Sequence, residues 1–260
     1  MQYAVGKSPI FIGGAPRSGT TLLRAIVNAS RNIVCGPEMR VIPALCHLAQ
    51  QIETAHLDVL TADYGLDADA LNARFAQLAP LHEKSGARVA EKTPANILHF
   101  RQLRRLFPDS PLIGIVRDGR DVVASLLSMD WRDNQGRPMA ITQDAGAAAE
   151  LWVRSVESGA RMHDDPNYLE LRYERLATDP EREIGRLFDK LGENDAAKAR
   201  AIDHARHFDR TAGQSESSAE RVAQPIDASA IGRWQRDLDD RQLAQIDAIA
   251  GHALRTLGYA

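Results

Sequence analysis

Ser8-Pro-Ile-Phe-Ile-Gly-Gly-Ala-Pro-Arg-Ser-Gly-Thr-Thr21 is the stretch of sequence that decides the fold. Its first half is a short β-rich run that ends in glycines, and residues 20–28 then space their apolar side chains as a helix does. The stretch therefore predicts a strand, a tight loop and a helix in direct succession. Free backbone N–H groups and the helix dipole at such a junction favour the binding of a phosphate or a sulfate.

The loop from Gly14 to Thr21 has the two glycines of a nucleotide P-loop at the usual spacing, but it lacks the lysine. Thr20 stands in the place of that lysine, and Arg17 supplies the positive charge from inside the loop. A triphosphate normally needs Mg²⁺ and the lysine during transfer, whereas a sulfuryl group on a phosphate carries less charge. Backbone amides, two threonine hydroxyls and one arginine can stabilise such a leaving phosphate without a metal. A glycine-rich turn with a surface arginine is the alternative interpretation.

The strand-and-helix unit recurs along the chain. We expect further strands at residues 88–92, 111–116 and 167–172, each followed by a stretch with helical features. Alternating strands and helices imply crossover connections. We therefore predict an α/β fold, with one P-loop-like domain over residues 1–260 and a mostly parallel central sheet flanked by helices on both faces. Residues 209–227, rich in Thr, Gly, Ser and Gln, are expected to form a loop, of which residues 215–227 cover the bound nucleotide as a lid.

The composition excludes several classes of protein. The 260 residues are 44% hydrophobic and 26% charged with a net charge of −3, which rules out disorder and gives no reason to expect nucleic acid as a partner. No apolar run is long enough for a membrane span or a signal peptide. Two cysteines, Cys35 and Cys46, cannot form a multi-disulfide framework or a cysteine zinc site. We therefore predict a cytoplasmic protein without a metal site.

A second basic turn, Arg117-Asp-Gly-Arg-Asp121, follows the strand expected at residues 111–116. An arginine at the carboxyl end of a parallel strand lies at the rim where such sheets bind ligands, and Ser125 falls on the same side of the following helix. Taken alone, the cluster fits a solvated network of ion pairs equally well. Together with the first loop, it gives two anion sites at adjacent strand ends, which suit a nucleotide with phosphates at its 5′ and 3′ positions.

Pro16-Arg-Ser-Gly-Thr-Thr21 resembles the 5′-phosphosulfate loop of the sulfotransferases that use 3′-phosphoadenosine 5′-phosphosulfate (PAPS), and Arg117 with Ser125 resembles their 3′-phosphate site. Within that superfamily the chain is most similar to the tyrosylprotein sulfotransferases. The segments that carry this similarity are residues 35–43, 91–94, 173–176 and 218–234. The resemblance implies PAPS as co-substrate, adenosine 3′,5′-bisphosphate (PAP) as product, and no metal.

The resemblance also implies a role for individual residues. It makes Glu38 the catalytic base and Arg40 part of the acceptor site. It brings Lys92 and Ser218 to the sulfuryl group or the bridging oxygen, and it gives Arg17 a catalytic role as well as a binding one. The nucleotide-binding residues that it implies are Arg17, Ser18, Gly19, Thr20, Thr21, Arg117, Ser125, Tyr173 and Arg233.

The sequence departs from the family pattern at three positions. Met129 stands where a further arginine is usual, one helical turn past Ser125, and Arg233 replaces a lysine while keeping its charge. Ala90 replaces the cysteine that would pair with Cys35 in secretory-pathway relatives, which agrees with a reduced compartment and a cytosolic enzyme of bacterial type.

A phenol has a pKa of about 10, so a carboxylate that accepts its proton during attack can raise the rate about 10²–10⁴-fold. We therefore expect in-line transfer of the sulfuryl group to a phenolic hydroxyl, in peptidyl tyrosine or a small phenol, with Glu38 as base. A carbohydrate or a small alcohol is the alternative acceptor, and residues 131–143 would then shape a different pocket.

Further expectations concern partners, the adenine contact and alternative functions. An acidic peptide would need a basic groove, for which Arg31, Arg40, Arg101, Arg104 and Arg105 are candidates. Trp234 is a candidate for stacking on adenine, and a homodimer is one assembly that we consider. A P-loop kinase and a nucleotide-binding protein without catalysis are the less favoured functions, and stabilisation by ATP with Mg²⁺ but not by PAP would indicate the kinase.

Overall fold

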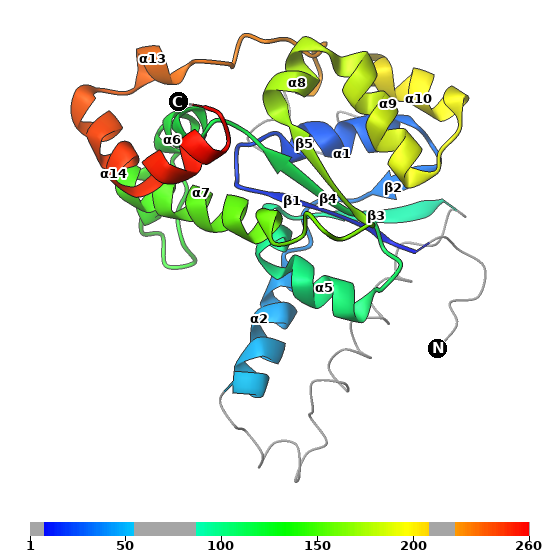
Figure 1. Ribbon diagram of the computed structural model, residues 1–260, viewed down its shortest axis with the longest axis horizontal. Helices are drawn as coiled ribbons and strands as arrows, with labels where there is room; N and C mark the ends of the chain where they lie inside the picture. The colour runs from blue at the N-terminus through cyan, green and yellow to red at the C-terminus, as the bar shows by residue number, and fades with distance from the viewer. Residues whose placement is uncertain (1–7, 55–86, 208–221, 260) are drawn as a thin grey trace.

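The computed structural model describes residues 8–54, 87–207 and 222–259. Five parallel strands form one sheet in the order β2-β3-β1-β4-β5 (Figure 1). The strands are β1 Ile10–Gly14, β2 Ile33–Cys35, β3 Arg88–Lys92, β4 Leu112–Val116 and β5 Tyr168–Arg172. This arrangement confirms the predicted α/β fold with a parallel central sheet.

The central strands β1 and β4 are buried along their whole length, which explains their continuous apolar sequence. Because side chains alternate between the faces of a strand, each strand contributes to two cores. Ile10, Ile12 and Ile113 belong to the core on one face of the sheet, and Phe11 and Leu112 belong to the core on the other.

Helices cover both faces of the sheet. On one face lie α1 Thr20–Ala29, α8 Tyr173–Thr178, α9 Pro180–Leu191, α10 Asp195–Ile202 and the short α11 His204–His207. On the other face lie α2 Val41–Thr54, the 3₁₀ helix η2 Pro94–His99, and α5 Phe100–Leu106. In Figure 1 the first group is seen above the sheet, while α2 and α5 lie below it.

A third group of helices extends from the carboxyl end of β4 and forms a core of its own. Its members are α6 Gly119–Leu127, the 3₁₀ helix η3 Ala140–Thr142, α7 Ala145–Ala160, α13 Trp234–Asp237 and α14 Asp240–Thr256. α7 is shared, because it also packs against η2 and β1. Trp152 is the large side chain at the centre of this core, where its indole N–H donates to the carbonyl oxygen of Arg117 at 2.9 Å.

The structure differs from the sequence-based expectation at two elements. The strand β2 was not predicted, because three residues between turn-forming neighbours give too short an apolar pattern. The helix expected over residues 97–107 is divided into η2, which begins at Pro94, and α5. Residues 215–221 of the expected lid lie outside the described residues, and one domain over 1–260 stays a prediction.

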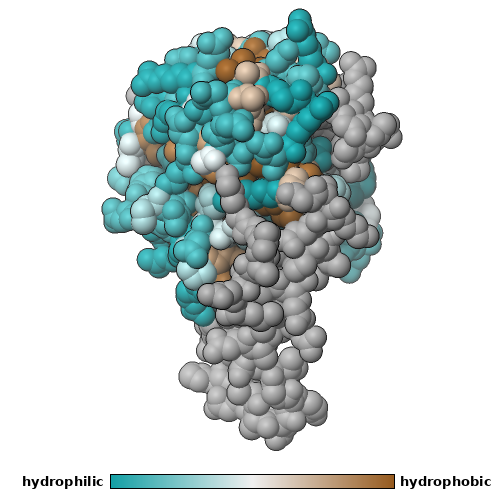
Figure 2. Space-filling model, turned by 90° about the vertical axis from the view of Figure 1, so that its right-hand side faces the viewer, coloured by the Kyte–Doolittle hydropathy of each residue, from teal (hydrophilic) through white to brown (hydrophobic). Residues whose placement is uncertain are grey.

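The described surface seen in Figure 2 is mostly hydrophilic, with only small hydrophobic areas between polar ones. Over the described parts of the chain, no helix combines the length and the apolar character that crossing a membrane requires.

Candidate active site

A cavity of about 760 Å³ lies at the carboxyl ends of the strands. All five strands lead into it, since each is followed by at least one residue of the lining. These residues are Pro16 after β1, Glu38 after β2, Thr93 after β3, Arg117 after β4 and Tyr173 after β5. The position is the one at which open parallel sheets bind their ligands.

The loop after β1 has the backbone shape of an anion site. Arg17 and Gly19 both have positive φ, at 73° and 108°. A Cβ atom on residue 19 would lie 2.9 Å from Cδ2 of Tyr173, so only glycine fits at this turn. Gly19 is the N-cap of α1, and no described side chain caps the helix, so the first N–H groups of α1 remain available to an anion.

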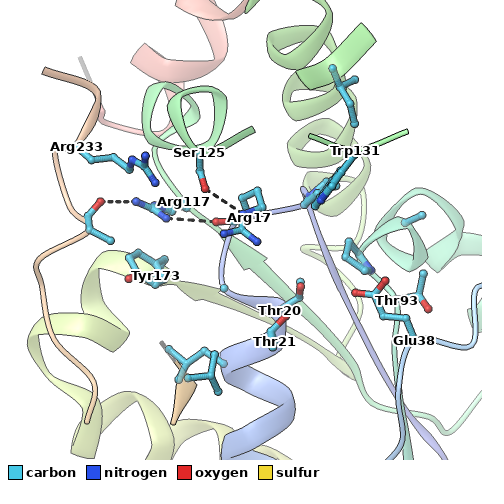
Figure 3. A pocket seen from close by; sticks show the side chains of 18 of the residues that line it. Arg17, Thr20, Thr21, Glu38, Thr93, Arg117, Ser125, Trp131, Tyr173 and Arg233 are labelled. Atoms are coloured by element: carbon cyan, nitrogen blue, oxygen red, sulfur yellow. Dashed lines mark hydrogen bonds between the residues drawn. The ribbon is translucent and has the colours of Figure 1, made fainter. Parts of the chain in front are cut away.

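Arginine side chains from three segments converge on this loop (Figure 3). Arg17 Nε donates to Ser125 Oγ at 3.0 Å, and Arg117 Nη1 donates to the backbone oxygen of Arg17 at 3.3 Å. The Arg117 guanidinium also lies over the Tyr173 ring, 4.5 Å from its centroid. Burial first, and then the positive charges of Arg117 and Arg233, lower the pKa of Arg17. A bound anion would relieve this repulsion.

Asp121 fixes the segment that carries Arg233. Its carboxylate is fully buried and accepts hydrogen bonds from the backbone N–H groups of Gly232 at 2.9 Å and Trp234 at 3.0 Å. It also pairs with Arg117 at 3.3 Å, and Arg117 in turn donates to the backbone oxygen of Ala230. We call residues 230–234 the strap. These contacts hold the strap against the start of α6 and beside the cavity.

The opposite end of the cavity carries a carboxylate. Glu38 Oε1 accepts a hydrogen bond from Lys92 Nζ at 2.7 Å, and Glu38 Oε2 lies 3.6 Å from Arg40 Nε. Lys92 is completely buried, whereas the Glu38 side chain is 21% exposed. Figure 3 shows Glu38 and Thr93 at one end, Arg117 and Tyr173 at the other, and Arg17 between them. The cavity thus has a basic end and a carboxylate end.

Most of the residues predicted for the site line this one cavity. They are Arg17, Gly19, Thr20, Thr21, Glu38, Arg40, Arg117, Ser125, Tyr173 and Arg233. Ser18 and Lys92 are buried and are not part of the lining. Ser218 lies outside the described residues. The roles assigned to all of these residues stay predictions.

Two weaker expectations receive no support from this arrangement. Trp234 is not part of the lining and instead packs against the Arg120 guanidinium, 4.3 Å from the ring centroid, whereas Trp131 does line the cavity. Of the arginines considered for a basic groove, only Arg40 lines the cavity. The guanidinium of Arg104 is instead paired with Asp165 at 2.6 Å.

Several residues that shape the site were given no individual role from the sequence. Asp121 was interpreted only as part of an ion-pair cluster, although its place four residues after Arg117 allows one helix turn to pair them. Thr93 lines the cavity and was not singled out. Trp131, Met139 and Ile141 form an apolar part of the wall, within the stretch expected to shape the acceptor pocket.

Known proteins similar to this chain identify its family. A family model described as "Sulfotransferase family" matches residues 9–196. The chain belongs to the sulfotransferase family. "Protein-tyrosine sulfotransferase A" of Caenorhabditis elegans is 28% identical to it, over 96% of this chain and 67% of that protein. This relative agrees with the resemblance to tyrosylprotein sulfotransferases.

Solved structures support the fold of this sulfotransferase. The sulfotransferase domain of the Synechococcus PCC 7002 olefin synthase is similar with a TM-score of 0.61 at 21% identity, covering 96% of this chain and 98% of that one. A mouse sulfotransferase in complex with PAP is similar with a TM-score of 0.57 at 20% identity, covering 96% of this chain and 85% of that one. The family match and the protein-tyrosine sulfotransferase relative confirm the enzyme class predicted from the sequence as sulfotransferase.

Ala90 and Cys35 of this sulfotransferase are direct neighbours across β2 and β3. Residue 90, at which the resemblance implies a cysteine in secretory-pathway relatives, is thus adjacent to Cys35. Cys35 and Cys46 are both buried and form no disulfide with one another.

Proposed function

We propose that this sulfotransferase moves a sulfuryl group from PAPS to a phenolic hydroxyl, with Glu38 as general base. The observation that carries the proposal is the cavity itself. It holds the converging guanidinium groups of Arg17, Arg117 and Arg233 at one end and the carboxylate of Glu38 at the other. A donor with two anionic groups needs the basic end, and an acceptor that loses a proton needs the carboxylate end.

The basic end supports a nucleotide with two phosphate groups. The N-terminus of α1, with Arg17, Thr20 and Thr21, would hold the 5′ phosphosulfate. Arg117 and Ser125 would hold the 3′ phosphate, since both line the same cavity. The fold shared with a mouse sulfotransferase in complex with PAP supports this choice of nucleotide.

The reaction needs one bond to form and one to break. PAPS supplies a sulfuryl group bonded to a phosphate oxygen, and the acceptor oxygen forms a new bond to sulfur as that bond breaks. Glu38 accepts the proton of the acceptor hydroxyl. Lys92 holds Glu38 in position through the hydrogen bond from Nζ to Oε1 at 2.7 Å. The negative charge that develops on the leaving phosphate is stabilised by Arg17 and by the N–H groups of the loop.

The wall near the carboxylate end supports an aromatic acceptor. Trp131, Met139, Ile141 and Pro43 contribute apolar surface there, and Arg40 and Arg132 add positive charge. Apolar and aromatic walls favour a flat ring over a sugar, whose hydroxyl groups would need polar partners. The protein-tyrosine sulfotransferase relative supports the same class of acceptor. Peptidyl tyrosine or a small phenol is therefore the acceptor that we propose.

The test is incubation with labelled PAPS and three kinds of acceptor: N-acetyltyrosinamide, a tyrosine-containing peptide and a monosaccharide. Added sulfonate is detected by mass, and we expect it on the phenols. Product confined to the sugar would refute the phenolic acceptor, and wild-type turnover by Glu38→Gln would refute the base. A cytoplasmic location and a homodimer remain predictions.

A further inference from the structure

The loop that carries Glu38 has little structure of its own. Residues 36–40 join β2 to α2 without forming a helix or a strand, and Arg40 has a positive φ of 51°. A side chain at such a position is strained unless its surroundings hold it. The position of the proposed base therefore depends on contacts from outside the loop.

The Glu91 carboxylate is hydrogen-bonded to the backbone of this loop. Its Oε1 accepts hydrogen bonds from the N–H of Met39 at 3.4 Å and from the Thr93 hydroxyl at 2.6 Å. The Thr93 oxygen accepts in turn from the N–H of Arg40 at 3.3 Å. The two residues that follow Glu38 are thus held by Glu91, one directly and the other through Thr93.

The same carboxylate connects this loop to the anion site. Asn96 Nδ2 donates to Glu91 Oε2 and also to the backbone oxygen of Ile12 at 3.1 Å. Ile12 belongs to β1, whose carboxyl end begins the loop of Arg17. A continuous chain of hydrogen bonds therefore runs from the loop of the proposed base to the strand that supports the proposed donor site.

Burial of Glu91 is costly, which argues that it has a specific role. The residue is only 4% exposed, and it is not part of the cavity lining. A buried carboxylate is unfavourable unless hydrogen bonds satisfy it, and here the donors are Met39 in the loop of the proposed base and Thr93 and Asn96 just after β3. An apolar side chain at residue 91 would avoid the cost but would leave the N–H of Met39 and the hydroxyl of Thr93 without this acceptor.

We propose that Glu91 is a positioning residue that sets Glu38 relative to the donor site. The inference rests on the proposed role of Glu38 as base. Glu91 touches neither substrate and acts by fixing the backbone of residues 39 and 40. Loss of this contact leaves nucleotide binding intact, because the residues of the anion loop keep their own contacts.

The test compares Glu91→Gln, Glu91→Ala and Thr93→Val with the wild type. Glutamine keeps one oxygen for Met39 and Thr93 but turns an NH₂ group towards Asn96, so it restores only part of the network. We expect turnover to fall about tenfold for the glutamine variant and about 10²-fold for the alanine variant, since small displacements of a base have such effects. The affinity for PAP should stay within about twofold, as expected for a site whose residues are untouched.

Amide hydrogen exchange of Met39 and Arg40 gives a second readout that needs no acceptor. We expect exchange at these amides to rise by at least about tenfold in Glu91→Ala, because local opening governs exchange. Thr93→Val, which creates no cavity, should raise exchange at Arg40 more than at Met39. If Glu91→Ala does not fold, as judged by circular dichroism, Glu91→Gln and Thr93→Val decide the question.

The matched control is Glu183→Gln. Glu183 is equally buried, at 2% exposure, and pairs with Arg186 at 2.7 Å in α9, away from the cavity. It should change neither turnover nor exchange at residues 39 and 40. Unchanged exchange in the Glu91 variants, or equal losses of turnover and PAP affinity, would overturn the inference. Normal turnover by Glu38→Gln would instead refute the proposed base, while the exchange data still decide the role of Glu91.

Discussion

At the scale of single residues, Glu91 links the site to the stability of the protein. Burial raises the pKa of Glu91 above its ordinary value of 4.5, although hydrogen bonds from Thr93, Asn96 and Met39 oppose the shift. The folded protein therefore holds the proton of Glu91 more tightly than the unfolded chain does. The resulting stabilisation is fully present below pH 4.5 and is lost as the pH rises through the folded pKa.

Glu91→Gln should remove this pH dependence, since glutamine does not titrate. The melting temperature of the wild type should fall relative to that of the variant as the pH rises from 4.5 through the folded pKa. Thermal unfolding of both proteins over a series of pH values measures the difference. A difference that stays constant from pH 4.5 upward would contradict the shift.

Arg117 is the residue whose geometry matters more than its charge. Its guanidinium donates to the backbone of Arg17 and of Ala230 and stacks on Tyr173, which a lysine ammonium cannot do at once. Arg117→Lys keeps the charge, but we expect the affinity for PAP to fall about 10–10²-fold. Isothermal titration with PAP measures the loss. Arg186→Lys, on the exposed side of α9, is the control and should bind PAP as the wild type does.

At the scale of elements, the strap and α6 form one unit through Asp121. A buried charge that receives two backbone N–H groups and a guanidinium is costly to disrupt. The α6 helix therefore does more than close the hydrophobic core. It holds the strap, and with it Arg233, at the cavity.

Asp121→Asn should loosen the strap. The amide NH₂ would replace one of the two oxygens that accept from the backbone N–H groups of the strap, so two donors would face each other. We expect unfolding free energy to fall by about 3–5 kcal/mol, as for other broken buried pairs, and PAP affinity to fall with it. Urea unfolding and PAP titration measure the two effects. Asp189→Asn removes the same charge from an exposed ion pair with Lys198 and should change neither quantity noticeably. Wild-type PAP affinity in Asp121→Asn would show that the strap does not depend on this carboxylate.

At the scale of the whole molecule, five strand ends meet at one cavity, so ligand binding and global stability are coupled. A ligand that binds only the folded state stabilises it by about 2.7 kcal/mol at one hundred times its Kd. PAP at that concentration should therefore raise the Tm by about 5–10 °C for a chain of this size. ATP with Mg²⁺ at the same concentration should raise it less, because the loop lacks the P-loop lysine. Differential scanning fluorimetry with both nucleotides gives the answer, and the reverse order would indicate a kinase.

The architecture could be predicted from the sequence because the patterns that indicate it are local. The apolar runs of β1 and β4 and the glycines between β1 and α1 are read within about a dozen residues. Glu91 and Asp121 could not be assigned from the sequence, since the contact that defines each of their roles is with a distant part of the chain, Met39 for Glu91 and the strap for Asp121. The resemblance to known sulfotransferases supplied Glu38, which no local pattern distinguishes from a surface glutamate in a turn.

The contact of Arg117 with the backbone of Arg17 has a consequence for which molecules the cavity selects. It ties the Arg117 guanidinium to the backbone of the loop that forms the first anion site, so the cavity selects a ligand by the distance between its anionic groups as well as by its charge. A nucleoside diphosphate with both phosphates on the 5′ carbon would leave the Arg117 site without a phosphate. The enzyme would then distinguish the two isomers by the distance between their phosphates.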